Sequence, residues 1–164
     1  MKRFAVIILV LIVIYPIYYT NFFQAHFVSD QYYKSIFESP FDVSKKGERL
    51  LIPIIFKYRT EYDLIISIPK NDKKCFFSEK NTLKYKFTSG GKILKEGVTY
   101  SPSNASHYSA SREGPLSAIL LTFNLPFHEA EDGLVLVLEV VKPLTSFRKY
   151  SGSIICTVEP ALMN

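Results

Sequence analysis

Residues 83–88 read Leu-Lys-Tyr-Lys-Phe-Thr, and this stretch decides the fold class. Apolar side chains alternate with lysine or threonine at every step. Successive side chains of a β-strand point to opposite faces of a sheet, so one face here is apolar and the other is solvated. The same alternation recurs at Tyr62, Leu64, Ile66 and Ile68. Both stretches predict strands with one face on a core.

Working outward, apolar runs bounded by turn residues predict further strands. The longer runs lie at 49–57, 116–125, 134–141 and 152–158, with short candidates at 41–44, 74–78 and 92–100. Turn pairs lie between them at Lys46-Gly47, Asn71-Asp72, Gly90-Gly91 and Asp132-Gly133. Pro53 lacks an N–H, which indicates an edge position or a bulge. The chain is therefore predicted to be mainly β, an antiparallel β-sandwich, with residues 101–115 as its longest loop.

The N-terminus carries a different signal. Phe4–Tyr19 contains no charged residue, and Phe23 extends the apolar stretch to 20 residues. At about 1.5 Å per residue, a helix of that length matches a hydrocarbon core of roughly 30 Å. Lys2 and Arg3 precede it, so the positive-inside rule places the N-terminus in the cytoplasm. Aromatic residues gather at the far end, as at a membrane interface: Tyr15, Tyr18, Tyr19, Phe22 and Phe23.

A cleaved secretory signal is the competing interpretation of this segment. Cleavage favours small residues at the first and third positions before the cut. Ala25 fits one position, but Phe23 would occupy the other and is bulky. The pattern favours an uncleaved anchor, with a single pass through the cell (inner) membrane and a C-terminal domain outside the cytoplasm. Both interpretations share that compartment.

The sequence divides into three parts on this basis. Residues 1–23 form the cytoplasmic tip and transmembrane helix, and 40–160 form the β-sandwich. In the juxtamembrane segment 24–39, aromatic and aliphatic residues recur three to four apart, a weak helical pattern. It fits a helix on the membrane surface, a helix packed on the domain, or a partly ordered tether.

The charge of the exported part is unevenly distributed. Residues 45–95 hold thirteen Lys or Arg against five Asp or Glu. A basic face meeting anionic lipid or an acidic protein is one interpretation, and lysines that solvate the outer face of a sheet are the other. The basic candidates are Lys45, Lys46, Arg49, Lys57, Arg59, Lys70, Lys73, Lys74, Lys84 and Lys86. Nucleic acid is not expected as a partner of an exported chain without a recognition helix.

Residues suited to chemistry are few. Cys75 and Cys156 can form a disulfide outside the cytoplasm, or stay as two separate thiols with Cys156 in an apolar strand. His26, His107 and His128 show no metal-ligand spacing, and no Gly-x-Ser-x-Gly elbow is present. We therefore expect neither a cofactor, a metal nor an enzyme activity.

Two stretches suggest a relationship. Ser39-Pro-Phe-Asp-Val-Ser-Lys-Lys-Gly-Glu48 and Tyr62-Asp-Leu-Ile-Ile-Ser67 resemble the opening of an uncharacterised bacterial family of secreted or membrane-anchored β-sandwich domains. The end of the chain, from Gly133, is similar as well, so the resemblance covers about 40–160. The lipoprotein cysteine of many members is replaced here by the apolar helix. The resemblance implies a β-sandwich and carries over no catalytic residues.

These features lead to two functional hypotheses. The first is a single-pass membrane-anchored binding module, in its most concrete form an immunity-type protein against an antibacterial toxin, with an unknown protein partner outside the membrane. The second is a structural or assembly factor of the envelope that contacts anionic lipid. Both use membrane lipid as a partner through residues 4–23.

Overall fold

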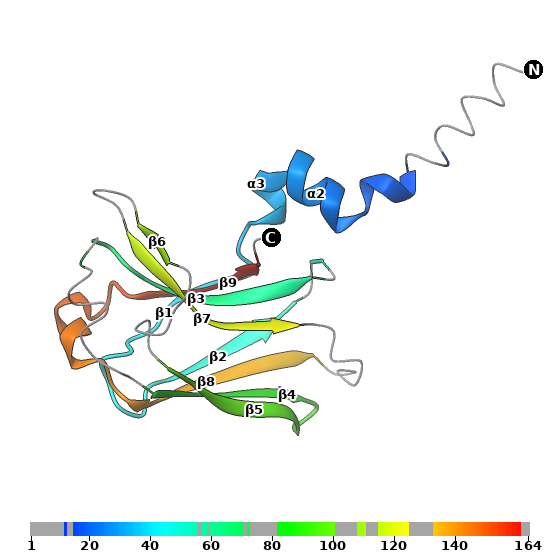
Figure 1. Ribbon diagram of the computed structural model, residues 1–164. Coiled ribbons are helices and arrows are strands. Elements are labelled where there is room, and N and C mark those ends of the chain that lie inside the picture. Colours follow the sequence, from blue (N-terminus) through cyan, green and yellow to red (C-terminus); the bar gives the residue numbers. More distant parts are fainter. Residues whose placement is uncertain are drawn as a thin grey trace, which may run out of the picture.

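The computed structural model describes residues 12, 15–55, 57–58, 60–70, 72, 82–100, 108–110, 115–124 and 133–161. Within them, two antiparallel sheets face one another (Figure 1). The five-stranded sheet has the order β1 (Phe37–Pro40), β9 (Ile155–Pro160), β3 (Glu61–Ile68), β7 (Leu116–Asn124) and β6 (Tyr108–Ala110). The four-stranded sheet has the order β2 (Arg49–Ile54), β8 (Leu134–Lys142), β4 (Thr82–Ser89) and β5 (Lys92–Tyr100). The predicted mainly β, two-layer fold is confirmed.

Alternate residues of the strands form the core between the sheets. In β3 the four alternating residues that predicted the strand are all buried. In β4, Leu83 and Phe87 are fully buried and Tyr85 packs against the core, whereas Lys84 is exposed. Full burial of one such side chain contributes on the order of 1.5–3 kcal/mol. Alternation therefore decides which face of each strand joins the core.

Pro53 and the Gly90-Gly91 pair act as predicted. Pro53 lies in β2, an edge strand of its sheet, where a missing N–H costs no ladder hydrogen bond on the solvent side. Gly90 and Gly91 both have positive φ, 53° and 79°, and join β4 to β5 in a two-residue hairpin turn. Left-handed backbone at both central positions is typical of the type I′ turn, which glycine adopts without strain.

Two short segments differ from the prediction. Residues 41–44 form no strand: all four are buried in a turn, and the strand β1 comes just before them at 37–40. Inside the predicted loop 101–115, β6 pairs with β7. The candidate strand at 74–78 lies outside the described residues. Burial of consecutive residues, as at 41–44, marks a turn whose polar groups find partners inside the protein.

Asp42 supplies those partners. Its Oδ1 accepts hydrogen bonds from the Ser44 N–H at 3.0 Å and the Ser44 hydroxyl at 2.6 Å, while Oδ2 accepts one from the Ser151 hydroxyl at 2.5 Å. Lys45 Nζ lies 3.2 Å from Oδ2. Burial alone would raise the pKa of this carboxyl, but the bonds from Ser151 and Ser44 and the Lys45 ammonium lower it to about 2. Asp42 therefore ties the turn to the segment before β9.

A helical segment precedes the sandwich. It contains α2 (Asn21–Phe27) and α3 (Ser29–Tyr32). Tyr19 and Thr20 lie outside helical geometry. Thr20 has an extended backbone, and its hydroxyl caps α2 by accepting from the Phe23 N–H at 3.2 Å. Among the described residues no helix is long and apolar enough to cross a membrane. Half of the predicted span 4–23 lies outside the described residues.

The helical segment is attached to one end of the sandwich. The Tyr32 side chain is fully buried, and its ring centroid lies 4.5 Å from that of Tyr58. Lys57 donates from Nζ to the Gln31 carbonyl. The buried Tyr62 hydroxyl accepts from the Tyr58 N–H and donates to the Tyr58 carbonyl, both at 3.0 Å. This tyrosine holds the β2–β3 connection, and the connection holds α3.

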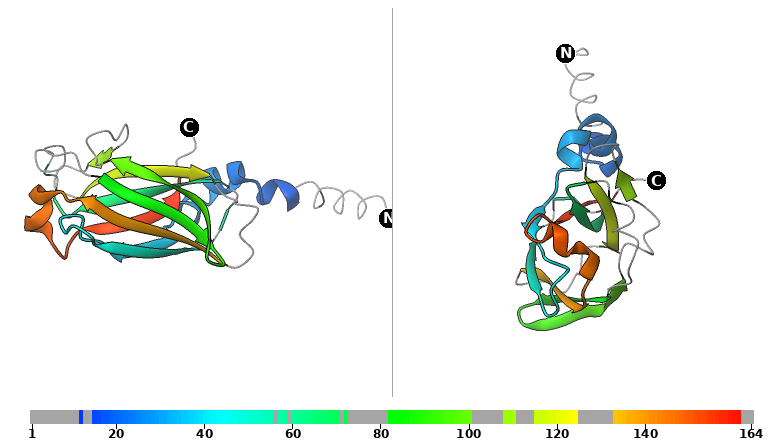
Figure 2. Two further views of the ribbon diagram at one scale, coloured as in Figure 1. Left: turned by 90° about the horizontal axis from the view of Figure 1, so that it is seen from below. Right: turned by 90° about the vertical axis from the view of Figure 1, so that its left-hand side faces the viewer.

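The attachment of the helical segment makes the two ends of the sandwich different. In Figure 2 the helical segment leaves one end of the sandwich along its long axis. The short 3-10 helix η2 (Thr145–Tyr150) lies at the opposite end. The Asp42 turn also lies there, since the Leu144 N–H donates to the Val43 carbonyl at 2.9 Å. The helix-bearing end and the η2 end are therefore separated by the length of the strands.

Replacement of Asp42 tests the turn. We expect Asp42→Asn to lower the free energy of unfolding by about 1.5–3 kcal/mol at pH 7, because hydrogen bonds to a charged acceptor are lost. The carboxyl has a lowered pKa in the folded chain, so its stabilisation is present above the ordinary pKa of 3.8 and is lost as the pH falls towards about 2. Urea unfolding of the full chain in detergent, at pH 7 and near pH 2, measures both.

The matched control is Asp30→Asn on the exposed side of α3. It should leave stability within about 0.5 kcal/mol of wild type. Equal effects of the two substitutions at pH 7 would show that the Asp42 carboxylate does not hold the turn.

Candidate functional site

The outer face of the four-stranded sheet is the candidate site. Strand register arranges its side chains in three rows that run across β2, β8, β4 and β5. The first row consists of Arg49, Glu139, Lys84 and Val98. The second row consists of Leu51, Val137, Lys86 and Glu96. The third row consists of Pro53, Val135, Thr88 and Ile93.

Charges alternate along the first row. Glu139 Oε2 accepts from Arg49 Nη2 at 2.9 Å and from Arg49 Nε at 3.1 Å. Lys84 lies beside the same glutamate on the next strand. An exposed pair of this kind contributes about 0.2–1 kcal/mol and is screened by salt, so it orders the surface more than it stabilises the fold. The face is mixed in charge rather than uniformly basic.

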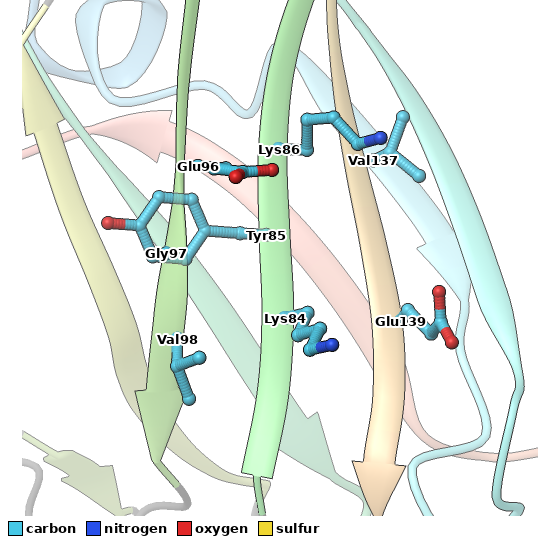
Figure 3. Close-up of a pocket in the computed structure, with 8 residues that line it drawn as sticks. All are labelled: Lys84, Tyr85, Lys86, Glu96, Gly97, Val98, Val137 and Glu139. Atoms are coloured by element: carbon cyan, nitrogen blue, oxygen red, sulfur yellow. The ribbon is translucent and has the colours of Figure 1, made fainter. Parts of the chain in front are cut away.

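A hollow of about 480 Å³ lies on this face (Figure 3). Residues of the first two rows line it together with Tyr85 and Gly97: Lys84, Lys86, Glu96, Val98, Val137 and Glu139. The side chains that β4, β5 and β8 present on this face combine two aliphatic groups with charges of both signs. Such a composition is suited to contact with a protein or peptide surface.

Position 97 requires a glycine because a larger side chain would clash with Tyr85. A Cβ built there would be 2.5–2.9 Å from the phenol ring and hydroxyl of Tyr85, its cross-strand partner. Real Cβ atoms do not approach other atoms so closely. The absence of a side chain at Gly97 lets the Tyr85 ring lie against the backbone of β5 (Figure 3).

The predicted basic residues lie in several places. Arg49, Lys84 and Lys86 share the outer face. Lys45, Lys46 and Lys70 lie at the η2 end; Lys45 pairs with Asp42, and Lys70 precedes Asp72, which accepts from the Tyr150 hydroxyl at 3.0 Å. Lys57 is at the opposite end, against α3. Arg59, Lys73 and Lys74 lie outside the described residues. The described cations therefore do not form one continuous patch.

Cys156 is fully buried between the sheets. Burial raises the pKa of its thiol to about 12, so the thiolate needed for reaction is not formed at neutral pH. Cys75 lies outside the described residues, and the disulfide between the two stays a prediction.

Of the three histidines, His26 is described. It lies in the last turn of α2, where its ring stacks on Phe22 with centroids 4.3 Å apart and Nδ1 is 3.0 Å from the Phe22 carbonyl. These contacts give it a local structural role. His107 and His128 lie outside the described residues.

A pair of carboxylates lies on the opposite side of the molecule. Asp63 of β3 is buried, accepts a hydrogen bond from the Thr122 hydroxyl at 2.5 Å, and is in register with Glu159 of β9. Burial, and then the nearby Asp63 carboxylate, raise the pKa of Glu159. The pair belongs to the five-stranded sheet and does not contribute to the hollow.

Comparison with known proteins supports the fold. No protein-family model matches the chain, and no curated protein matches it significantly. The chain is similar to the crystal structure of a protein from Sulfurospirillum deleyianum, with a TM-score of 0.52 and 10% identity over 78% of this chain and 98% of that chain. At this identity the similarity shows the fold alone.

Sequence reasoning identified the lysines of the site and missed its partners. Glu96 and Val98 lie on β5 and Glu139 lies on β8, whereas Lys84 lies on β4. The register between the strands brings these side chains together. Gly97 was the one feature of the sequence that could have indicated the position of the site. A glycine inside a strand pattern indicates a bulge or a close approach by another group, and here that group is Tyr85.

A double-mutant cycle tests the contact between Tyr85 and Gly97. We expect Gly97→Ala to destabilise the chain by roughly 1–3 kcal/mol, because the ring must leave its place. The cost should fall below about 0.5 kcal/mol when Tyr85→Ala has already removed the ring. Urea unfolding of wild type, both single variants and the double variant gives the coupling. Additive effects would show that the ring does not occupy this position.

Proposed function

We propose that this chain is a single-pass membrane-anchored module that binds a protein outside the membrane. The observation that carries the proposal is the set of apolar side chains left exposed on the helical segment. Seven large apolar residues there are 45–71% exposed: Ile12, Tyr15, Ile17, Tyr18, Tyr19, Phe22 and Phe27. Soluble monomers rarely leave so contiguous an apolar surface in water.

Lipid is the partner that fits this surface. From Phe4 to Phe27 the sequence contains no Asp, Glu, Lys or Arg, and tyrosine and phenylalanine concentrate in its second half. Tyrosines favour the boundary between hydrocarbon and headgroups, where the ring is buried and the hydroxyl stays hydrated. The helical segment then stands at the membrane surface, with the apolar N-terminal residues inserted.

The contacts that attach α3 orient the sandwich above the membrane. The buried Tyr32 and the Lys57–Gln31 hydrogen bond join the segment to one end of the sheets. In the proposed arrangement the η2 end points away from the bilayer. The outer face of the four-stranded sheet is then accessible from the side.

The binding role follows from the outer face. It offers a hollow, aliphatic side chains and both charge signs, which are the components of a protein interface. An immunity-type protein needs only to cover the harmful surface of a toxin. A small anchored domain that meets the toxin as it reaches the membrane can do so without chemistry of its own.

The alternative role, contact with anionic lipid through the basic residues, has less support. Lys45, Lys46 and Lys70 lie at the η2 end, which faces away from the bilayer in the proposed arrangement. The cations of the outer face alternate with glutamates. Neither group forms a uniform surface for headgroups.

Capture from living cells tests the proposal. The full chain with a C-terminal tag is cross-linked in membranes and compared with a chain carrying Lys84→Glu and Lys86→Glu. We expect an exported protein to be recovered at least about tenfold less well with the variant, since reversal of two charges opposes complementarity. When the recovered protein is exported to the outside of the membrane, it should kill cells that lack this chain and should not kill cells that produce it.

The outcomes distinguish the general proposal, a binding module, from its specific form, an immunity-type protein. Recovery of a protein that is not toxic would reject the immunity role and keep the binding module. Equal recovery by wild type and variant would show that the outer face is not the binding surface. Because Lys84→Glu faces Glu139 and Lys86→Glu faces Glu96, the variant should lose some stability, and urea unfolding checks that it is folded before capture.

A further inference from the structure

The sandwich has four edge strands among its described strands, and three of them are protected. β1 is four residues long and ends in Pro40. β6 has only three residues. β2 carries Pro53 in its interior. Short strands and proline are the usual means of preventing another strand from pairing with an exposed edge.

β5 is the exception. It has nine residues without proline, and among the described strands it pairs with β4 alone. A register shift opposite Phe87 and Thr88 places a bulge in its first half, where Lys92 and Lys95 also lie. Bulges and lysines protect an edge. Among the described residues, the part of β5 without a bulge or a lysine is therefore the second half, Glu96–Tyr100, where the Thr99 hydroxyl donates inwards to the Leu120 carbonyl of β7.

Two exposed apolar side chains lie in that half, and a third, Ile93, lies before the bulge. Val98 is 43% and Tyr100 is 54% exposed, on the outer face of an edge strand. Apolar residues next to unpaired backbone donors and acceptors form a template for an added strand, in which main-chain hydrogen bonds give affinity and side-chain contacts give specificity.

We infer that Glu96–Tyr100 of β5 binds an extended strand of a partner protein, and that the strand carries a basic residue beside Glu96 and apolar residues beside Val98 and Tyr100. The inference rests on the proposed role as a binding module and names the edge that would make the contact. The added strand would continue the rows of the outer face by one position.

The end of each row specifies the partner. In the second row Lys86 precedes Glu96, and Glu96 forms no ion pair with a described residue. A cation on an added strand would lie directly beside this carboxylate, the cross-strand arrangement that stabilises opposite charges. Val98 and Tyr100 favour β-branched or aromatic neighbours for the same reason.

A second copy of this chain fits the edge less well. The outer-face residues of this half are Glu96, Val98 and Tyr100, and none of them is a cation. In antiparallel self-pairing Glu96 would meet Glu96, Val98 or Tyr100 of the other copy, depending on the centre of the pair. The carboxylate gains no partner in any of these registers, so charge complementarity favours a different chain.

Two synthetic peptides serve as probes. In Thr-Val-Thr-Val-Thr-Lys-Thr an antiparallel strand would place Lys beside Glu96, and the reversed sequence does so for a parallel strand. Each peptide has a matched version with Glu in place of Lys. The full chain is held in lipid nanodiscs, with empty nanodiscs as the blank, and fluorescence anisotropy measures binding of labelled peptide.

We expect one orientation to bind, and the Lys peptide to bind roughly two- to fivefold tighter than its Glu version. Glu96→Lys should reverse that preference. Val98→Asp should weaken binding at least about tenfold, since it removes apolar contact at the centre of the edge. Leu51→Asp, on the opposite edge of the same sheet, should change nothing.

Several results would overturn the inference. They are no binding of either orientation, binding unaffected by Val98→Asp, or binding lost in Leu51→Asp. Self-association of the chain that Val98→Asp abolishes would assign the edge to a second copy instead. If neither peptide binds but a partner is still captured from cells, the β5 edge is not the binding site, and the proposed function stands.

Discussion

The structure depends on one constraint: each strand can place only every second side chain in the core between the two sheets. This requirement sends Leu83 and Phe87 inwards and leaves Lys84 and Lys86 outside. It aligns the outward residues of neighbouring strands in rows, because antiparallel partners in register point the same way. The mixed outer face, the hollow and the side chains beside the open edge all follow from it.

Much of the fold could be predicted from the sequence because that constraint leaves a period of two in the chain. The alternation in β4 and the glycine pair before β5 predicted their strands and turn. The turn at 41–44 could not be distinguished from a strand, since its four consecutive buried residues depend on Asp42 finding Ser151, more than a hundred residues away. β6 is too short to produce a pattern.

The candidate site was less predictable, for a physical reason. A sequence shows which residues point outwards, but the register between strands decides which of them become neighbours. Lys84 meets Glu139 and Val98 through two different ladders. The helical segment shows the same limit: its apolar composition predicted lipid, while its attachment depends on Tyr32 and Tyr58 packing together.

Cysteine labelling tests most directly whether the outer face of the four-stranded sheet lies outside the cytoplasm. In a Cys75→Ser chain, Val98→Cys puts a thiol on the exposed edge, while Cys156 stays silent because it is buried with a pKa of about 12. We predict that a membrane-impermeant maleimide labels this thiol in intact cells stripped of any outer membrane, and that permeabilisation adds nothing. Labelling only after permeabilisation would contradict the account.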